Sequence, residues 1–241
     1  MVDRFPRPRL LPAAEDAVLI EFSPSIDPAL APLIAAWSEA IHNNLGHWLT
    51  DLVPSYGSIT VYYDPSRIDF RLIISRLNRI PESLCEVSGQ PEGRIIELPV
   101  WYHPSVGPDL NTLADACGLD PVQVAAVHSG TGYQVYALGF SPGFAFMGQV
   151  DPTIATPRLE RPRTRVPAGS VGIANRQTAV YPSVSPGGWQ LIGRCPTSLF
   201  DEESLALLRV GDQVRFRSVG RKEFMDLGGD DTPFEERGAP A

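Results

Sequence analysis

Residues 163–194 read RTRVPAGSVGIANRQTAVYPSVSPGGWQLIGR, a stretch in which short apolar runs alternate with clusters of proline and glycine. The runs SVGI, TAVYP and WQLIG each have the length of a short strand, and the clusters between them are typical of tight turns. The run DQVRFR, at 212–217, continues the pattern. Short strands punctuated in this way predict a β-barrel or a β-sandwich.

The segment that precedes this stretch extends the same domain. Residues 94–102, RIIELPVWY, and 133–140, YQVYALGF, read as further strands. Between them the apolar spacing predicts two short helices, at 110–117 and 120–128, and the second opens with Asp, Pro and Gln in the spacing of a capping box. We therefore assign residues 94–220 to one β-barrel domain.

The N-terminal part of the chain alternates strands with helices. Apolar runs at 17–22 and 58–63 predict strands. A helix is predicted at 28–44, and a second helix is predicted to open at Asp64, which a proline follows. This order predicts an α+β domain of the split-βαβ (ferredoxin-like) kind over residues 15–90.

Three segments have the composition of connections or tails. Residues 1–14 are rich in proline and arginine, which predicts disorder. Residues 88–93, SGQPEG, are polar and turn-forming and are the predicted linker between the two domains. The acidic residues, glycines and prolines of 221–241 predict a loose tail.

The composition of the chain excludes several classes of function. A net charge of −8 argues against general binding to nucleic acid or to an anionic membrane. The apolar runs are too short to cross a bilayer and no signal-peptide pattern is present, so a cytoplasmic location is predicted. No C-x-x-C or H-E-x-x-H pattern occurs, so no metal site is expected. Lys222 is the single lysine, and its context is not that of a P-loop.

The stretch GFSPG, residues 139–143, matches the G-x-S-x-G pattern of serine hydrolases. In those enzymes the backbone N–H of the residue after the serine helps to form the oxyanion hole, and Pro142 has no N–H. A long helix should also follow the serine, but a proline arrives within nine residues of Gly143. We therefore interpret this stretch as a rigid turn that presents phenylalanine side chains.

Residues 155–176 hold a local concentration of arginine on an otherwise acidic chain. Five arginines face one acid, Glu160, which gives a local balance of +4. Arginine binds a carboxylate or phosphate through two parallel hydrogen bonds, and the interleaved glycines allow backbone N–H groups to approach a ligand. A stiff pocket for a small anionic or amide-containing ligand is one interpretation. The other is that turn-rich barrels need glycine and proline while surface arginines are solvated.

A co-linear set of motifs within residues 15–220 resembles one known family. The set comprises GPDL (107–110), His128, GFSPGF (139–144), ATPRLERPRTRVPAGSVGI (155–173), QTAVYP (177–182), SPGGWQLIGR (185–194), LFD (199–201) and VGDQVRF (210–216). These motifs are similar to those of the B subunits of bacterial 5-oxoprolinases, a family also described as allophanate hydrolase subunit 1 or carboxyltransferase subdomain C/D. Kinase-inhibitor relatives belong to the same family.

The resemblance implies a cyclophilin-like β-barrel after the small α+β domain. It also implies work with two partners, namely an A subunit and a homologue of the C subunit (carboxyltransferase subdomain A/B). In 5-oxoprolinases these chains together open the lactam of 5-oxoproline to L-glutamate. No covalently bound cofactor is expected, ATP is expected to be used on a partner chain, and the free chain is expected to be inactive alone.

The resemblance, with the chemistry of the side chains, assigns candidate roles. Arg163 and Arg194 are candidate anion clamps, and Ser170 and Gln177 are candidate positioning groups. Tyr181 and Trp189 are candidate aromatic walls, although a tryptophan at such a position is also typical of a core. His128 is either a proton shuttle or a helix C-terminal residue favoured by the dipole. The remaining candidates line the substrate site through turns or backbone: Phe140, Pro142, Gly143, Phe144, Gly169, Gly187 and Gly188.

Two other functions stay open from the sequence. The first is carboxyl transfer of the urea-carboxylase or allophanate-hydrolase type, for which biotin would have to arrive on another chain because Lys222 is the only lysine here. The second is regulation, in which the chain binds and inhibits a histidine kinase and its pocket has no catalytic role.

Overall fold

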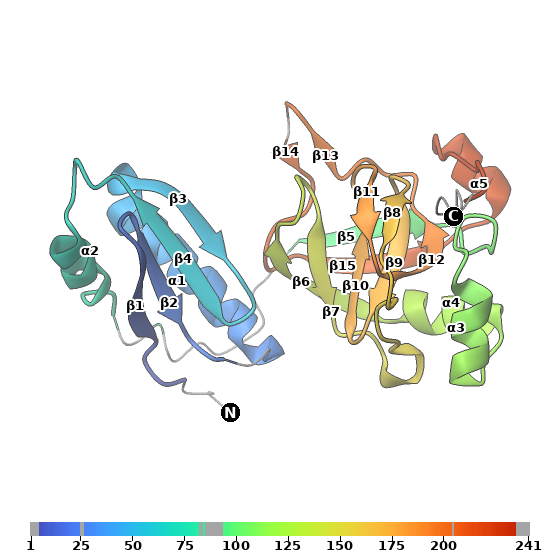
Figure 1. The fold of residues 1–241 in the computed structure, drawn as a ribbon, viewed down its shortest axis with the longest axis horizontal. Helices are drawn as coiled ribbons and strands as arrows, with labels where there is room; N and C mark the ends of the chain where they lie inside the picture. Colours follow the sequence, from blue (N-terminus) through green and yellow to red (C-terminus); the bar gives the residue numbers. More distant parts are fainter. Residues whose placement is uncertain (1–4, 25–26, 82–83, 85–93, 204, 235–241) are drawn as a thin grey trace. The chain divides into compact units, whose positions relative to one another are not determined.

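A computed structural model describes residues 5–24, 27–81, 84, 94–203 and 205–234 of the chain. The chain divides into two compact units, residues 1–93 and 94–241, each with its own hydrophobic core (Figure 1). The predicted linker at 88–93 lies outside the described residues. The molecule is a mixed α/β protein, as predicted, and the two units are described separately below.

The first unit is built on a four-stranded antiparallel sheet in the order β1-β2-β4-β3. Because β2 and β3 both pair antiparallel with β4, they run in the same direction, and helix α1 joins one to the other. The elements of this unit are β1 Arg9–Ala14, β2 Ala17–Glu21, η1 Pro28–Leu30, α1 Ala31–Leu45, η2 Gly46–Trp48, β3 Leu49–Pro54, β4 Ser58–Tyr63 and α2 Phe70–Leu77.

Helix α1 carries the apolar stripe that its sequence predicts. Leu33, Ile34, Trp37 and Ile41 recur at helical spacing, and all are buried against the inward side chains of β2 and β4. Helix α2 begins later than predicted. Its N-cap is Asp69, whose side chain accepts the N–H of Leu72 at 2.8 Å, whereas the Asp64 side chain caps only a preceding turn.

The predicted disorder of residues 1–14 is wrong for Arg9–Ala14, which form strand β1. The backbone of β1 pairs with β2, and the Arg9 guanidinium forms an ion pair with Glu21 across the two strands. Pro12 is tolerated because β1 is an edge strand and its register with β2 shifts between Pro12 and Ala14. Cross-strand pairing therefore outweighs the local composition.

The second unit is built on a seven-stranded sheet in the order β12-β9-β10-β7-β6-β15-β5, which curls into a partial barrel (Figure 1). Strand β15 lies between β6 and β5 and is parallel to β5, although about 118 residues separate the two strands in sequence. The strands of this unit are β5 Ile95–Val100, β6 Gly132–Leu138, β7 Ala145–Gly148, β8 Arg163–Val166, β9 Ser170–Ala174, β10 Gln177–Val180, β11 Ser185–Gly187, β12 Gln190–Arg194, β13 Phe200–Asp201, β14 Leu205–Ala206 and β15 Gln213–Ser218.

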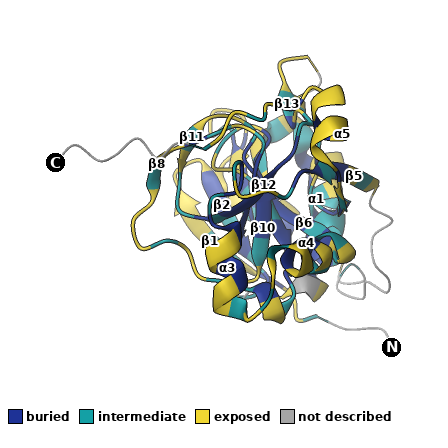
Figure 2. Ribbon diagram, turned by 90° about the vertical axis from the view of Figure 1, so that its right-hand side faces the viewer, coloured by how far each residue is buried: buried dark blue, intermediate teal, exposed yellow. Residues whose placement is uncertain are grey.

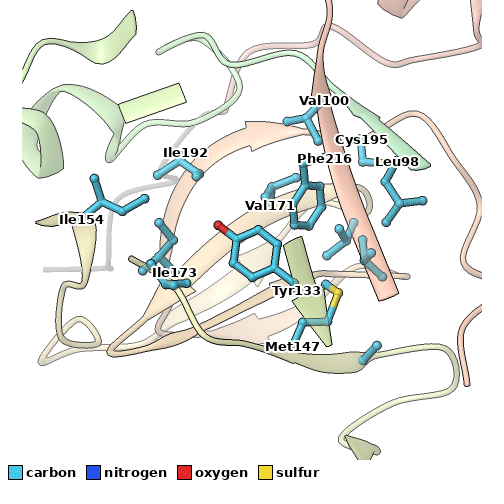
Figure 3. Packing of buried hydrophobic residues seen from close by; sticks show 14 of the residues in the cluster. Leu98, Val100, Tyr133, Met147, Ile154, Val171, Ile173, Ile192, Cys195 and Phe216 are labelled. Atoms are coloured by element: carbon cyan, nitrogen blue, oxygen red, sulfur yellow. The ribbon is translucent and has the colours of Figure 1, made fainter. Parts of the chain in front are cut away.

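The concave side of this sheet encloses an apolar core. Figure 3 shows the ring of Tyr133 lying among the side chains of Met147, Ile173 and Phe216, which come from different strands of the sheet. Two helices, α3 Leu110–Cys117 and α4 Pro121–Gly130, pack against β12 and β15 and show their exposed residues on the outer side (Figure 2). The predicted capping box at the start of α4 is present.

The predicted loose tail is also wrong over much of its length. Residues Arg221–Asp226 form helix α5, and its Phe224 is fully buried against Trp101 and Val106. The chain stays attached to the unit as far as Phe234, whose backbone N–H donates to the carbonyl of Ser105 at 2.7 Å. The buried ring of Phe224 and the backbone hydrogen bond of Phe234 both anchor the segment.

Within the described ranges, no helix has both the length and the apolar character that a bilayer crossing demands. Among the same residues, no cluster of three or more His, Cys, Asp or Glu side chains is arranged to hold a metal ion.

Candidate functional site

The five arginines of residues 155–176 do not line one pocket. Arg158, Arg161, Arg165 and Arg176 are exposed, and Arg163 alone is partly buried. Of the five, only Arg163 and Arg165 lie on strand β8, and only Arg163 is turned toward the interior. For the four exposed arginines the structure favours the interpretation in which surface arginines are solvated.

Arg163 forms a two-pronged ion pair inside the unit. Its Nη1 and Nη2 donate to Asp109 Oδ2 at 3.0 Å and Oδ1 at 2.8 Å, and both side chains are nearly buried. Asp109 Oδ2 also accepts the backbone N–H of Leu191 at 2.7 Å. The pair thus joins β8, the start of α3 and β12. The predicted clamp for an external anion instead holds an internal carboxylate.

Arg194, at the end of β12, lies in a different environment. Only 2% of this residue is exposed, and its Nη1 donates to the backbone carbonyls of Asp230 at 2.8 Å and Thr232 at 2.9 Å. The Nε and Nη2 atoms are buried and have no hydrogen-bond partner among the described residues. Burial lowers the pKa of this guanidinium, and the nearby charges of Asp230 and Asp231 oppose that shift.

Ser170 lies directly opposite Arg194 in the register of β9 and β12. Ser170 is fully buried, and its Oγ also lacks a partner within the described part of the chain. The neighbouring Gly169 has a positive φ of 77°, and a Cβ there would lie 2.3 Å from the Cys195 carbonyl oxygen and 3.2 Å from Arg194 Cγ. Arg194, Ser170 and Gly169 therefore form one compact polar site, which we call the Arg194 site.

Replacing Gly169 with alanine is expected to lower the free energy of unfolding by about 3 kcal/mol, because the new Cβ meets both an unfavourable φ and a backbone oxygen. Gly118→Ala is the matched control. Gly118 has a φ of 67°, but no atom lies within 4 Å of the place that its Cβ would take, so the same replacement is expected to cost about 1 kcal/mol. Urea unfolding of both variants measures the difference, and equal losses would contradict the close approach at Gly169.

One segment covers both candidate clamps. We call residues 230–234 the C-terminal segment. Its carbonyls at Asp230 and Thr232 hold Arg194, and the ring of Phe234 lies 5.1 Å from the guanidinium carbon of Arg163. Sequence reasoning missed this segment because its acidic, proline-bearing composition predicts a loose tail. No residue type in the sequence could have suggested the contact with Arg194, because backbone carbonyls make it and every residue carries one.

The predicted aromatic walls form a small second core. Phe144, Tyr181 and Trp189 are buried together, with ring centroids 5.3 Å apart for Phe144 and Tyr181 and 5.7 Å apart for Phe144 and Trp189. Gly187 is required beside them, because a Cβ there would lie 2.3 Å from the Tyr181 hydroxyl oxygen. The structure therefore gives these aromatic residues a packing role beside β8 and β11.

The turn at residues 139–144 has the form that the sequence predicts. A strand, β7, follows the turn instead of the helix that a nucleophile elbow needs. Phe140 adopts a positive φ of 70° and is 63% exposed, and Pro142 is exposed beside it. Gly143 packs against the Leu199 carbonyl, which fixes the turn on the sheet.

His128 lies in the core and cannot exchange protons with a ligand at the Arg194 site. The Tyr102 hydroxyl lies 2.7 Å from its Nδ1, and its Nε2 lies 2.9 Å from Thr178 Oγ1. Because Thr178 Oγ1 donates to the Gly172 carbonyl at 3.0 Å, it accepts from His128, which places the ring proton on Nε2. Burial lowers the pKa of His128 to about 3. His128 does lie in the last turn of α4, as one of the two interpretations expects, but its lowered pKa supports neither a proton shuttle nor a stabilising charge at neutral pH.

Of the other candidates, Gln177 stands partly buried at the start of β10, opposite Gly148 of β7. Gly188 accepts the N–H of Leu159 through its carbonyl at 2.7 Å, so it serves the loop before β8. The structure therefore brings Arg194, Ser170 and Gly169 together and places the remaining candidates in packing, in turns or elsewhere on the sheet.

The four-stranded α/β unit followed by the curled sheet defines a carboxyltransferase-like fold. The urea carboxylase of Kluyveromyces lactis shares it, with a TM-score of 0.73 at 20% identity over 97% of this chain and 24% of that one. The crystal structure of TTHA0988 matches with a TM-score of 0.75 at 36% identity, over 85% of this chain. The present chain spans only 40% of the length of that protein.

Residues 8–208 match the family described as carboxyltransferase domain, subdomain C and D. A protein named as the B subunit of 5-oxoprolinase, from Bacillus subtilis (strain 168), is 38% identical over 221 residues, which cover 87% of this chain and 92% of the relative. The chain belongs to the carboxyltransferase subdomain C and D family.

Proposed function

We propose that this chain is the B subunit of a 5-oxoprolinase. The observation that carries the proposal is the 38% identity to the Bacillus subtilis protein of that name along 92% of its length. In the proposed reaction the lactam C–N bond of 5-oxoproline breaks, a water oxygen bonds to the carbonyl carbon, and the ring nitrogen takes a proton, which gives L-glutamate. ATP hydrolysis on a partner chain drives the reaction, and the complex works in the cytoplasm.

The geometry supports a share in binding more than a share in proton transfer. The Arg194 site offers cationic and hydroxyl donors, while His128, the candidate shuttle, is neutral and buried in the core. We therefore assign activation of the lactam and attack by water to the partners, which are the A subunit and the homologue of the C subunit. The free chain is expected to be inactive.

The two units also support finer fold assignments. We assign residues 15–90 to the split-βαβ (ferredoxin-like) class, because β2 and β3 run in the same direction with β4 between them and α1 joining them. We assign residues 94–220 to the cyclophilin-like barrels, on the grounds of the curled seven-stranded sheet. The segment 221–234 is an ordered extension of the second unit.

A chain of a carboxyltransferase complex is the second candidate. The shared fold with the urea carboxylase of Kluyveromyces lactis favours it, although 20% identity concerns the fold alone. Such a complex would need biotin on another chain, because Lys222, the only lysine, lies on the short surface helix α5.

Mixing the purified chain with the A and C subunits of its own source is expected to give ATP-dependent release of glutamate from 5-oxoproline. Omitting this chain, or ATP, is expected to abolish that release. Glutamate can be followed by a coupled dehydrogenase assay. If the two partners release glutamate equally well without this chain, the proposed function is wrong; biotin-dependent carboxyl transfer to urea in a parallel assay would support the second candidate.

A further inference from the structure

Two arginines elsewhere in this chain bind a carboxylate through one guanidinium edge, although Arg163 uses its Nη1 and Nη2 atoms instead. Arg94 uses Nε and Nη2 together to hold the two oxygens of Asp212, and Arg221 uses the same two atoms on Asp231. These two nitrogens lie on one side of the planar group and present parallel N–H bonds, which match the spacing of carboxylate oxygens. This edge is the one that Arg194 leaves without a described partner.

Within the described residues no carboxylate forms an ion pair with Arg194, although the charges of Asp230 and Asp231 act on it. The two acids nearest to it are engaged elsewhere, since Asp230 Oδ1 accepts the N–H of Thr232 at 2.9 Å and Asp231 pairs with Arg221. Neutral backbone carbonyls hold Nη1 and do not cancel the charge. A buried cation that forms no ion pair is costly, and this cost makes Arg194 a candidate for binding an anionic ligand.

Ser170 supplies a third donor at the same place. Its hydroxyl is fully buried, lacks a partner in the described ranges, and projects from the residue paired with Arg194 in the sheet. Because Gly169 has no side chain, the backbone beside Ser170 and the stem of Arg194 approach closely. Two N–H bonds on one edge plus one hydroxyl suit the two oxygens of a single carboxylate.

We propose that the Nε and Nη2 atoms of Arg194, with the Ser170 hydroxyl, bind the carboxylate of a small lactam acid of the 5-oxoproline class beneath the C-terminal segment. The identity of the ligand rests on the proposed function, whereas the preference for a carboxylate rests on the site. A phosphate dianion is disfavoured because Asp230 and Asp231 stand beside the guanidinium and repel a second negative charge.

The C-terminal segment must move for a ligand to reach this site, since Arg194 is 2% exposed. One of its attachments is the ion pair between Arg221 and Asp231, in which the arginine side chain is 68% exposed. Exposed pairs of this kind contribute less than about 1 kcal/mol, so this attachment opposes opening only weakly. The segment then closes over the bound acid and holds the third nitrogen of the arginine.

The test compares two lactams that differ only in the carboxylate, 5-oxoproline and 2-pyrrolidinone. The complete chain is titrated with each, and binding is followed by NMR chemical shifts. A charge-assisted hydrogen-bonded pair contributes about 1.5–3 kcal/mol, so 5-oxoproline is expected to bind at least about tenfold more tightly than 2-pyrrolidinone. Equal affinity for the two lactams, no binding of 5-oxoproline, or tighter binding of inorganic phosphate would each overturn the proposal.

Variants locate the effect at the site. Arg194→Gln is expected to weaken binding of 5-oxoproline at least about tenfold and to leave that of 2-pyrrolidinone unchanged. Ser170→Ala removes a hydroxyl that has no described partner, so it is expected to fold normally. It is expected to weaken 5-oxoproline binding severalfold, and it keeps the proposal testable if Arg194→Gln does not fold. Arg217→Gln, in an exposed ion pair on β15, is the control and should bind as the unchanged chain does. Unaltered binding by Ser170→Ala and by a folded Arg194→Gln would place the ligand elsewhere.

The two proposals can fail independently. Carboxylate-dependent binding at Arg194, without glutamate release by the reconstituted complex, would support the proposed site and contradict the proposed 5-oxoprolinase function. Glutamate release with an unchanged KM for 5-oxoproline in Ser170→Ala and Arg194→Gln complexes would keep the function and remove the site.

Discussion

Replacing Asp109 with alanine is expected to lower the free energy of unfolding of the second unit by about 3–5 kcal/mol, because it breaks a nearly buried ion pair from one side. The change leaves the Arg163 guanidinium without its carboxylate and leaves the N–H of Leu191 without an acceptor. It also disconnects β8, the start of α3 and β12 at one point. Urea unfolding, with hydrogen exchange to assign the loss to the second unit, measures the effect.

The control for this experiment is an exposed ion pair in the same unit. Glu97 pairs with Arg217 while its side chain is 58% exposed, so Glu97→Ala is expected to cost less than about 1 kcal/mol. The double variant Asp109→Leu with Arg163→Met replaces both charges by apolar groups and is expected to recover much of the loss. If Asp109→Ala lowers the free energy of unfolding no more than Glu97→Ala does, the ion pair between Asp109 and Arg163 does not stabilise the second unit as expected.

Replacing His128 with alanine is expected to lower the free energy of unfolding by about 3–5 kcal/mol, since it empties a fully buried site, leaves the Tyr102 hydroxyl without its acceptor and removes the donor to Thr178 Oγ1. His103→Ala removes an exposed ring that stacks on Trp101 and serves as the control, with an expected loss below about 1 kcal/mol. Urea unfolding measures both. A small loss for His128→Ala would contradict its place in the core network.

The same histidine predicts a dependence of stability on pH. Its pKa falls from 6.5 in the unfolded chain to about 3 in the folded one, so between these values the unfolded chain binds the extra proton. The stabilisation is complete above pH 6.5 and is lost as the pH falls, by about tenfold in the folding equilibrium constant per pH unit, until about pH 3. His128→Gln is expected to remove this part of the slope, and parallel slopes for the two proteins between pH 6 and pH 4 would refute the assignment.

The sequence predicted those strands and helices whose ends are marked by turn residues or by a capping motif. Strands β9, β10 and β12 were predictable because turn residues bound each short apolar run, and α4 was predictable from its capping box. Strand β1 was missed because its stability comes from pairing with β2, and the local amino-acid composition does not show which strand a segment will pair with. Helix α2 was placed too early because Asp64 and Asp69 both resemble helix N-caps, and tertiary packing decides between them.

The sequence identified the types of residue in the candidate site, but it did not predict which groups those residues contact. Arg163 and Arg194 both stood out, yet one holds an internal carboxylate and the other presents a buried edge without a described partner. The difference depends on Asp109, which lies 54 residues before Arg163. Asp109 belongs to the GPDL motif. That motif supports the resemblance to the family, but it does not predict that the Asp109 side chain contacts Arg163. The C-terminal segment, which buries Arg194, has a composition that predicts disorder.

The position of β15 has a consequence for synthesis of the chain. In the seven-stranded sheet as described, strand β5 pairs with β15 alone, and β15 also closes the edge of β6. Because β15 spans Gln213–Ser218, a nascent chain on the ribosome carries two unpaired strand edges until residue 218 has emerged. Transcripts truncated before this strand should therefore give aggregating products, and during translation the unit should depend on chaperones that shield open edges.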